Sequence, residues 1–293
     1  AFFKITLRQY FQIVSSRLHC GHRGIFQGSG FRVRSTMSYG TIKFEVKDSL
    51  CWIGLSREDT RNAINAQMCL EITEAMQRAV RDKQVRVVIV YGVGHCFSAG
   101  GDLKSELPSL DDDVLETIYK PMLLSVFHST KPVVCMVHAY AIGVASALAM
   151  AADFLFMEDD AYLMQPFIGI GLIPDGGVTW HLVNHLGRKK ALEVIVSGEK
   201  ISASDCVTLG ISNRSCPAEK LTDETQEWAE SVAEKPPLAI RYAKEALNKA
   251  MELNLADAIS YEARLQNITM LSDDSQEGVL AFFEKRKPRF KGR

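Results

Sequence analysis

The chain has 293 residues, of which 47% are hydrophobic and 24% are charged, a composition typical of a globular protein with a substantial core. Its formal net charge of -1 gives no general attraction to nucleic acid or anionic lipid, so we expect no nucleic-acid partner. The 7 cysteines are an odd number, and none falls in a CxxC or Cys/His spacing that holds zinc. We therefore expect reduced thiols and no metal site.

The N-terminal segment is basic and contains no acidic residue before Glu45. Its arginines are interspersed with aromatic and serine residues, which is the composition of a mitochondrial transit peptide. We expect residues 1–37 to be such a leader and the mature protein to act in the mitochondrial matrix. A disordered tail, or upstream sequence before a true start at Met37, is the open alternative.

Strand and helix patterns alternate after the leader. Residues 42–46 and 50–55 predict paired strands, joined through Lys47-Asp48-Ser49. Apolar residues then recur at helical spacing between Met68 and Ala79, which predicts an amphipathic helix. Residues 85–90 predict a buried strand. This alternation predicts an α/β fold with much of its sheet covered on both faces.

Residues 132–152 contain no Asp, Glu, Lys or Arg, and the stretch is long enough for a transmembrane helix. Gly143 and Ser146 interrupt it, and a β-rich run at 133–137 precedes an Ala-rich helical one. We therefore expect a buried strand, a glycine turn and a buried helix, and no membrane span.

Helical patterns alone continue from Thr222 to the C-terminus, with Pro236-Pro237 as a break. The expected organisation is thus a core of residues 38–221 followed by a helical C-terminal subdomain of residues 222–293.

Two glycine-bearing turns can carry chemistry. Residues 95–103 follow a predicted strand, and their small side chains let backbone N–H groups approach an anion or a carbonyl closely. Residues 139–147 form a second strand-to-helix turn, where N–H groups at a helix N-terminus are available. Together they can form a two-donor oxyanion hole for a thioester enolate.

With these turns, residues 39–293 resemble the crotonase (enoyl-CoA hydratase/isomerase) superfamily. The resemblance also includes Arg61-Asn62-Ala63-Ile64-Asn65, Lys131-Pro132-Val133-Val134 and the segments 169–174, 198–203 and 277–288. It implies a crotonase-like core of coiled ββα units, a C-terminal region that assembles homotrimers or hexamers, and an acyl-CoA thioester substrate. Coenzyme A is then part of the substrate, and no separate cofactor is expected.

The resemblance implies roles for single residues. The N–H groups of Gly101 and Val144 would be the oxyanion donors, and the Ala99 carbonyl would meet the adenine of coenzyme A. Arg61 and Lys285, the latter from a neighbouring subunit, would contact the nucleotide phosphates, with solvated surface charge as the open alternative. The expected substrate-binding residues are Arg61, Ala63, Ala99, Gly101, Phe167 and Lys285.

The departures from the family pattern concern the acids. Hydratases of this family use two glutamates, and the aligned positions here are Ala147 and Phe167. Neither side chain can transfer a proton, whereas hydration must deprotonate a water and protonate the substrate α-carbon. The resemblance therefore disfavours ordinary hydratase activity.

Asp175, in Pro174-Asp175-Gly176-Gly177, matches the catalytic acid of several isomerases of the family. In that role it would move a proton from C2 to C4 and convert a 3-enoyl-CoA into a 2-enoyl-CoA. The same four residues are a good turn sequence in which Asp caps a helix beginning near Val178. Both interpretations stay open.

Two other classes compete with the isomerase. Val144 and Phe167 can narrow the acyl pocket, which favours a non-catalytic acyl-CoA-binding relative. An RNA-binding relative ranks last, because the chain after the leader shows no basic stripe with interleaved aromatics.

Overall fold

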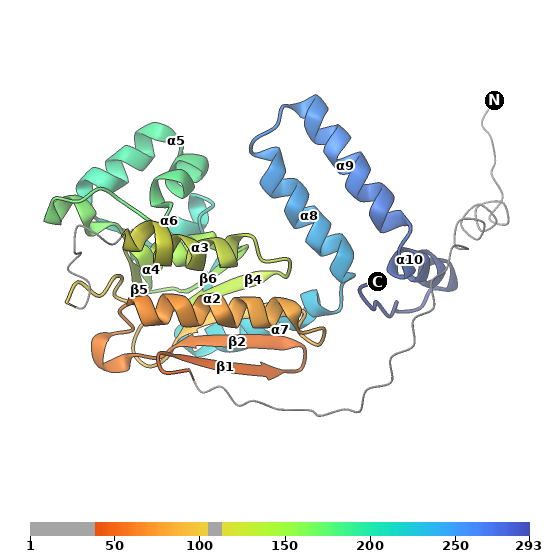
Figure 1. Ribbon diagram of the computed structural model, residues 1–293, viewed down its shortest axis with the longest axis horizontal. Helices are drawn as coiled ribbons and strands as arrows, with labels where there is room; N and C mark the ends of the chain where they lie inside the picture. The colour runs from red at the N-terminus through yellow and green to blue at the C-terminus, as the bar shows by residue number, and fades with distance from the viewer. Residues whose placement is uncertain (1–38, 105–112) are drawn as a thin grey trace.

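A six-stranded sheet carries the core of the protein (Figure 1). The computed structural model describes residues 39–104 and 113–293, so the expected leader lies outside the described residues. The strand order is β1-β2-β3-β4-β6-β9, and a three-stranded sheet has the order β5-β7-β8. The strands are β1 (Ile42–Lys47), β2 (Leu50–Leu55), β3 (Val87–Gly92), β4 (Val133–Val137), β5 (Tyr140–Ile142), β6 (Phe154–Glu158), β7 (Tyr162–Met164), β8 (Lys200–Ser202) and β9 (Arg214–Cys216).

The large sheet is antiparallel only at its first pair of strands, and its remaining neighbours are parallel. Asp48 and Ser49 join β1 to β2 with positive φ angles of 49° and 68°, which is the geometry of a tight hairpin turn. The paired strands expected from the sequence are thereby confirmed. The first four residues of β3 are fully buried, as a central parallel strand requires.

Helices cover both faces of the large sheet. Figure 1 shows α2 and α3 on one face and α7 on the other. The helices are α2 (Ala66–Arg81), α3 (Lys120–Phe127), α4 (Val144–Ala151), α5 (Val178–Ser197), α6 (Ala203–Thr208), α7 (Ala218–Ala233), α8 (Pro237–Ala250), α9 (Leu255–Met270) and α10 (Asp273–Glu284), with short turns η1 (Glu58–Thr60), η2 (Leu115–Tyr119) and η3 (Pro166–Ile170).

The helix expected around residues 68–79 is α2. The Asn65 side chain accepts the Met68 N–H at 3.0 Å and caps its N-terminus. Its apolar stripe, which includes Met68 and Ile72, is fully buried. The uncharged stretch 132–152 forms β4, β5 and the buried helix α4. No helix in the described part of the chain is long and apolar enough to cross a membrane.

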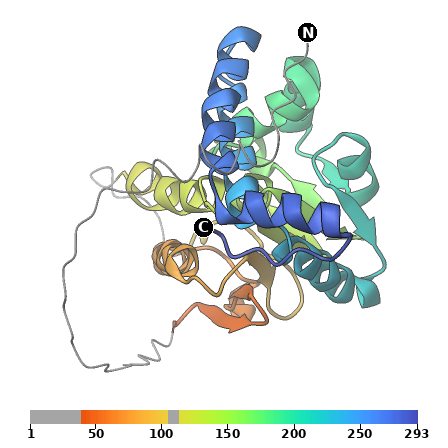
Figure 2. The ribbon, with the colours of Figure 1, turned by 90° about the vertical axis from the view of Figure 1, so that its right-hand side faces the viewer.

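The C-terminal region is helical, as expected. α7, however, packs on the sheet through Leu221 and Ala229, so the expected boundary between residues 221 and 222 falls inside a helix of the core. Beyond it, α8, α9 and α10 extend to one side of the core (Figure 1), and Figure 2 shows α10 crossing at a steep angle to α9. A partly buried ion pair, between Lys244 of α8 and Asp153 at 2.7 Å, connects this extension to the core.

Candidate active site

The two glycine-bearing turns lie side by side. The Ser98 N–H donates to the Tyr140 carbonyl at 3.2 Å, and the Ile142 N–H donates back to the Ser98 carbonyl at 3.2 Å. A Cβ atom built on Gly100, whose φ is +96°, would lie only 2.6 Å from the Ile142 carbonyl oxygen. Glycine is therefore required at position 100 for the turns to meet.

The direction of the Gly101 N–H is set by the other end of its peptide unit. That unit contains the Gly100 carbonyl, which accepts the Ile64 N–H at 2.7 Å. Because the C=O and N–H of a trans peptide point in opposite directions, the Gly101 N–H points away from Ile64. Within the described residues it donates to no backbone carbonyl, so it remains available to a ligand.

The Val144 N–H lies at the N-terminus of α4, where backbone donors have no partner within the helix. Its peptide unit contains the Gly143 carbonyl, which accepts the N–H groups of Ser146 at 3.0 Å and Ala147 at 3.2 Å. Gly143 has φ 56° and ψ −124°, a backbone conformation that residues other than glycine rarely adopt.

The two N–H-bearing residues and Phe167 are neighbours. A Cβ atom built on Gly101 would lie 4.0 Å from Val144 Cγ1, and one built on Gly143 would lie 3.5 Å from Phe167 Cζ. Phe167 is buried at 8% exposure. Its ring therefore forms a wall beside the second turn, where the expected acyl group would pass.

The Asp175 loop packs against the first turn of α4. A Cβ atom built on Gly176 would lie 3.1 Å from Ala147 Cβ and 3.5 Å from Val144 Cγ2. The Asp175 carboxylate is half-buried, and its Oδ1 is fully buried with no hydrogen-bond partner among the described residues. Asp175 thus lies in the loop that contacts the second turn, one residue along the chain from the contact at Gly176.

Burial raises the pKa of Asp175, partly offset by its own backbone N–H, and no neighbouring charge contributes. The carboxylate does not cap α5. The residue at the N-cap of that helix is Gly177, with no side-chain cap, and the Val178 N–H bonds the backbone carbonyl of Asp175 at 3.1 Å. The capping interpretation is therefore wrong.

The residues expected to hold coenzyme A fall into two groups. Arg61 is exposed, and its carbonyl accepts the Ala99 N–H at 3.0 Å, so these two residues and the buried Ala63 lie beside the first turn. Lys285 is exposed at the end of α10. Figure 1 places α10 on the opposite side of the molecule from β5, so the chain does not bring its own Lys285 to this site.

Asn62 is a structural residue of the site that the sequence did not reveal. It is fully buried with φ 55°. Its side chain accepts the Arg57 N–H and donates to the carbonyls of Val93 and Cys96, each at 2.9 Å. It thereby fastens the Arg61 loop to the first turn. The sequence did show an amide side chain, Asn62, inside the motif of residues 61–65. Its role could not be read from there, because Val93 and Cys96, to which it donates, are distant in sequence.

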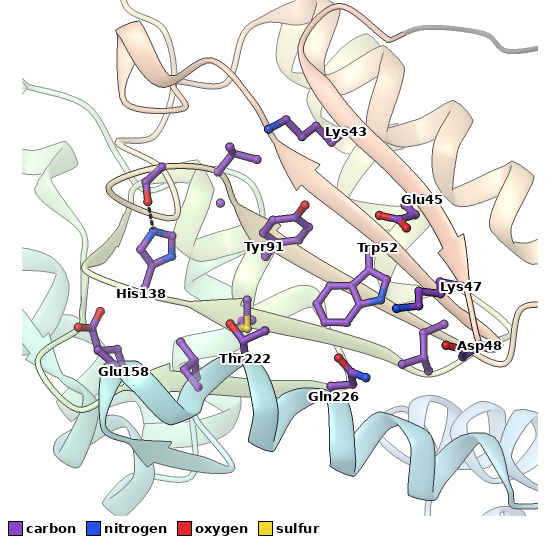
Figure 3. Close-up of a pocket in the computed structure, with 17 residues that line it drawn as sticks. Lys43, Glu45, Lys47, Asp48, Trp52, Tyr91, His138, Glu158, Thr222 and Gln226 are labelled. Carbon is purple, nitrogen blue, oxygen red and sulfur yellow. Dashed lines mark hydrogen bonds between the residues drawn. The ribbon is translucent and has the colours of Figure 1, made fainter.

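A cavity of about 750 Å³ lies elsewhere, between the sheet and α7. Figure 3 shows Trp52 and Tyr91 of the sheet facing Thr222 and Gln226 of α7 across it. His138, at its edge, is hydrogen-bonded to the Gly94 carbonyl at 3.0 Å. Gly101, Val144 and Asp175 are absent from its lining, so this cavity is separate from the candidate site.

No group of His, Cys, Asp and Glu in the described ranges could hold a metal ion. Gly101 and Val144, which bear the expected N–H donors, are neighbours, and the loop of Asp175 packs against α4. Two N–H donors and one carboxylate can together move a proton next to a carbonyl whose oxygen becomes negative.

Comparison with known proteins agrees with this geometry. The family model for enoyl-CoA hydratase/isomerase matches residues 45–293. The chain is 35% identical over 260 residues to a probable enoyl-CoA hydratase of Rhodobacter capsulatus, covering 88% of this chain and 100% of that protein. It is 34% identical over 243 residues to a mitochondrial enoyl-CoA hydratase of Pongo abelii, covering 82% of each.

Among solved structures, an enoyl-CoA hydratase from Bacillus anthracis superposes with a TM-score of 0.83 at 28% identity, covering 87% of this chain and 100% of that one. The fold and the paired turns define a crotonase-type protein. The chain belongs to the enoyl-CoA hydratase/isomerase family. That family description includes both reactions, so the acids of the site must distinguish them.

Proposed function

We propose that this protein is an enoyl-CoA isomerase that converts a 3-enoyl-CoA into a 2-enoyl-CoA, with Asp175 as the proton shuttle. The observation that carries the proposal is the half-buried Asp175 carboxylate, which does not cap α5 and belongs to the loop that packs against Val144 and Ala147. The two positions that hold glutamates in hydratases of the family are Ala147 and Phe167.

The proton shift needs a single carboxylate. The thioester oxygen accepts hydrogen bonds from the N–H groups of Gly101 and Val144. Asp175 removes a proton from C2, and the electron pair delocalises onto the thioester oxygen while the C3–C4 double bond remains. The protonated Asp175 then returns the proton to C4, and the double bond closes between C2 and C3. No atom is gained or lost.

The raised pKa of Asp175 suits both halves of this cycle. A carboxylate of higher pKa is a stronger base toward C2, and its protonated form remains a competent acid toward C4. Both N–H donors are backbone groups held before the substrate arrives, and such preorganised donors lower the energy of the enolate more than that of the neutral thioester.

Hydration is the competing reaction, because the named relatives are hydratases. Water addition needs a second proton-transferring group, and Ala147 and Phe167 cannot supply it. The test incubates the purified protein with 3-enoyl-CoA and, separately, with 2-enoyl-CoA. The proposal expects 2-enoyl-CoA from the first and little 3-hydroxyacyl-CoA from the second. Fast hydration without isomerisation would overturn it.

A non-catalytic acyl-CoA-binding protein is the second candidate. The observation that favours it is the Phe167 ring, 3.5 Å from the Cβ position of Gly143, which narrows the space beside the second turn. This candidate predicts tight binding of enoyl-CoA esters with no conversion over a panel of chain lengths. Measurable isomerisation of any member would dismiss it.

We propose a homotrimer or hexamer acting in the mitochondrial matrix. Large apolar side chains of the C-terminal extension are exposed, among them Leu255 at 77% and Phe282 at 78%, and a monomer rarely leaves such a surface uncovered. The location rests on the basic leader and on two relatives, from Dictyostelium discoideum and Pongo abelii, whose names include the word mitochondrial.

A further inference from the structure

Two fully buried polar side chains lie behind the second turn. Ser146 has an exposed fraction of 0% and is the only polar residue of α4, whose sequence is VASALAMA. Gln165, just before η3, also has an exposed fraction of 0%. Burying a hydroxyl and an amide in apolar surroundings is unfavourable unless they are hydrogen-bonded. Gln165 Oε1 has no hydrogen-bond partner among the described residues, whereas Gln165 Nε2 and Ser146 Oγ are both hydrogen-bonded.

The two side chains form a directed chain of hydrogen bonds. Gln165 Nε2 donates to Ser146 Oγ at 2.5 Å. Ser146 Oγ donates to the Gly143 carbonyl at 2.7 Å. A hydroxyl has one proton to give, so by accepting from the amide Ser146 is left to direct its proton at the carbonyl.

The Gly143 carbonyl and the Val144 N–H belong to one peptide unit. A hydrogen bond to the carbonyl oxygen polarises the amide and strengthens its N–H as a donor. It also opposes rotation of the peptide plane, which matters because Gly143 has a backbone conformation that is sparsely populated. Side chains behind the turn can therefore control a backbone group that faces the substrate.

We propose that Gln165 and Ser146 are positioning residues that orient and polarise the Val144 N–H as an oxyanion donor. The inference rests on the proposed function in one respect, that the Val144 N–H binds the thioester oxygen. The Gly100 carbonyl of the first turn accepts the backbone N–H of Ile64, whereas the Gly143 carbonyl accepts two backbone N–H groups and, in addition, the Ser146 hydroxyl. The side-chain contribution to donor strength is thus located at the second turn.

The primary test reads the thioester carbonyl directly. Wild type and variants are saturated with a 2-enoyl-CoA labelled with ¹³C at the thioester carbonyl, and isotope-edited infrared spectra give the stretching frequency of the bound carbonyl. A stronger donor lowers that frequency. We expect the lowest frequency in the wild type, an intermediate one in Gln165→Met, which leaves the Ser146 bond in place, and the highest in Ser146→Ala.

Kinetics with 3-enoyl-CoA give the second readout. For Ser146→Ala we expect kcat to fall about three- to tenfold, because one hydrogen bond that stabilises the transition state is weakened. KM should change less than about twofold, because the neutral thioester of the bound substrate carries little charge. Ser212→Ala is the matched control. It removes another buried hydroxyl that donates to a backbone carbonyl, that of Leu155 at 2.7 Å, and should move neither readout.

The outcomes separate this inference from the isomerase proposal. If the wild type shows no isomerase turnover but the bound carbonyl frequency still shifts in Ser146→Ala, the role of Gln165 and Ser146 is supported and the isomerase proposal is contradicted. If the frequency is unchanged in Ser146→Ala, the role of Gln165 and Ser146 is overturned, whatever the turnover. If Ser146→Ala fails to fold, Ser146→Cys, a weaker donor of similar size, and Gln165→Met take its place. Failure of the wild type to bind 2-enoyl-CoA would overturn both.

Discussion

In the proposed reaction Asp175 must be ionised to accept the C2 proton, so its replacement gives the most direct test of that proposal. Asp175→Asn keeps the shape of the side chain and removes the base. We expect kcat for isomerisation to fall by about 10²- to 10⁴-fold. Asp159→Asn, on an exposed acid, is the control and should retain wild-type turnover. An Asp175→Asn variant with undiminished kcat would remove this residue from the mechanism.

The pH profile should report the same carboxyl. Burial raises the pKa of Asp175 above the usual value of an aspartate, so kcat/KM should fall on the acid side with a midpoint above that usual value. The free energy of unfolding should change with pH in the opposite direction to kcat/KM. The unfolded chain ionises Asp175 at lower pH than the folded protein does, so wild type loses stability relative to Asp175→Asn as pH rises through the raised pKa. Urea unfolding of both proteins from acidic to neutral pH measures it.

The sequence identified Asp175 but could not assign its role. A helix cap and a catalytic base have the same local sequence, Pro-Asp-Gly-Gly, and only the position of the carboxylate relative to the Val178 N–H distinguishes them. Ser146 and Gln165 were missed for a related reason. Their hydrogen bond joins α4 to the residue before η3, and periodicity within one element carries no information about a contact between two.

At the scale of elements, the contact between the two turns depends on Gly100. In Gly100→Ala the new methyl group would meet the Ile142 carbonyl at 2.6 Å in a backbone with φ +96°. We expect a loss of about 3 kcal/mol in the free energy of unfolding, from steric overlap and backbone strain together. The matched control is Gly210→Ala, with φ +72° and open space around it, which should cost only about 1 kcal/mol. Equal losses in urea unfolding would contradict the close contact.

Helix α4 offers a test of the proposal that the protein is not a hydratase. Ala147 is fully buried, and its Cβ lies 3.1 Å from a Cβ position on Gly176. Ala147→Glu restores the family glutamate but buries an unpaired charge in an apolar helix, at a cost of about 3 kcal/mol. We expect no gain of hydratase activity. Ala147→Gln, the uncharged isostere, should be destabilised less. Efficient hydration of 2-enoyl-CoA by Ala147→Glu would show that the space for a glutamate exists.

Secondary structure was predictable where elements are long enough to show a period. The hairpin β1–β2, the helix α2 and the buried helix α4 follow directly from their patterns. Three-residue strands such as β5 and β8 are too short to show one, and their pairing is set by the turns around them. The helical pattern of α7 was visible too, but a pattern says only that one face is apolar, not that Leu221 and Ala229 pack on the sheet.

At the scale of the whole molecule, a single chain leaves the apolar side chains of the C-terminal extension exposed and holds α10 far from the candidate site. α8 buries no residue completely, and Phe282 and Phe283 of α10 are 78% and 65% exposed. Helix α10, whose C-cap is Lys285, the expected phosphate contact, lies away from β5 in its own chain (Figure 1). A trimer in which each α10 reaches a neighbour would cover the apolar residues and deliver the lysine in one step.

Mixed oligomers can test whether Lys285 acts across subunits. Asp175→Asn subunits have no base but an intact Lys285, whereas Lys285→Ala subunits have the base and lack the cation. In a trimer that shares the lysine, a Lys285→Ala subunit beside an Asp175→Asn neighbour recovers a complete site. Co-expressed, doubly tagged hybrids should therefore turn over limiting 3-enoyl-CoA faster than either parent oligomer. The control hybrid pairs Asp175→Asn with the double variant Asp175→Asn/Lys285→Ala and should stay inactive. If the lysine acted within its own chain, no hybrid would exceed the Lys285→Ala parent, because every subunit with a base would still lack its cation.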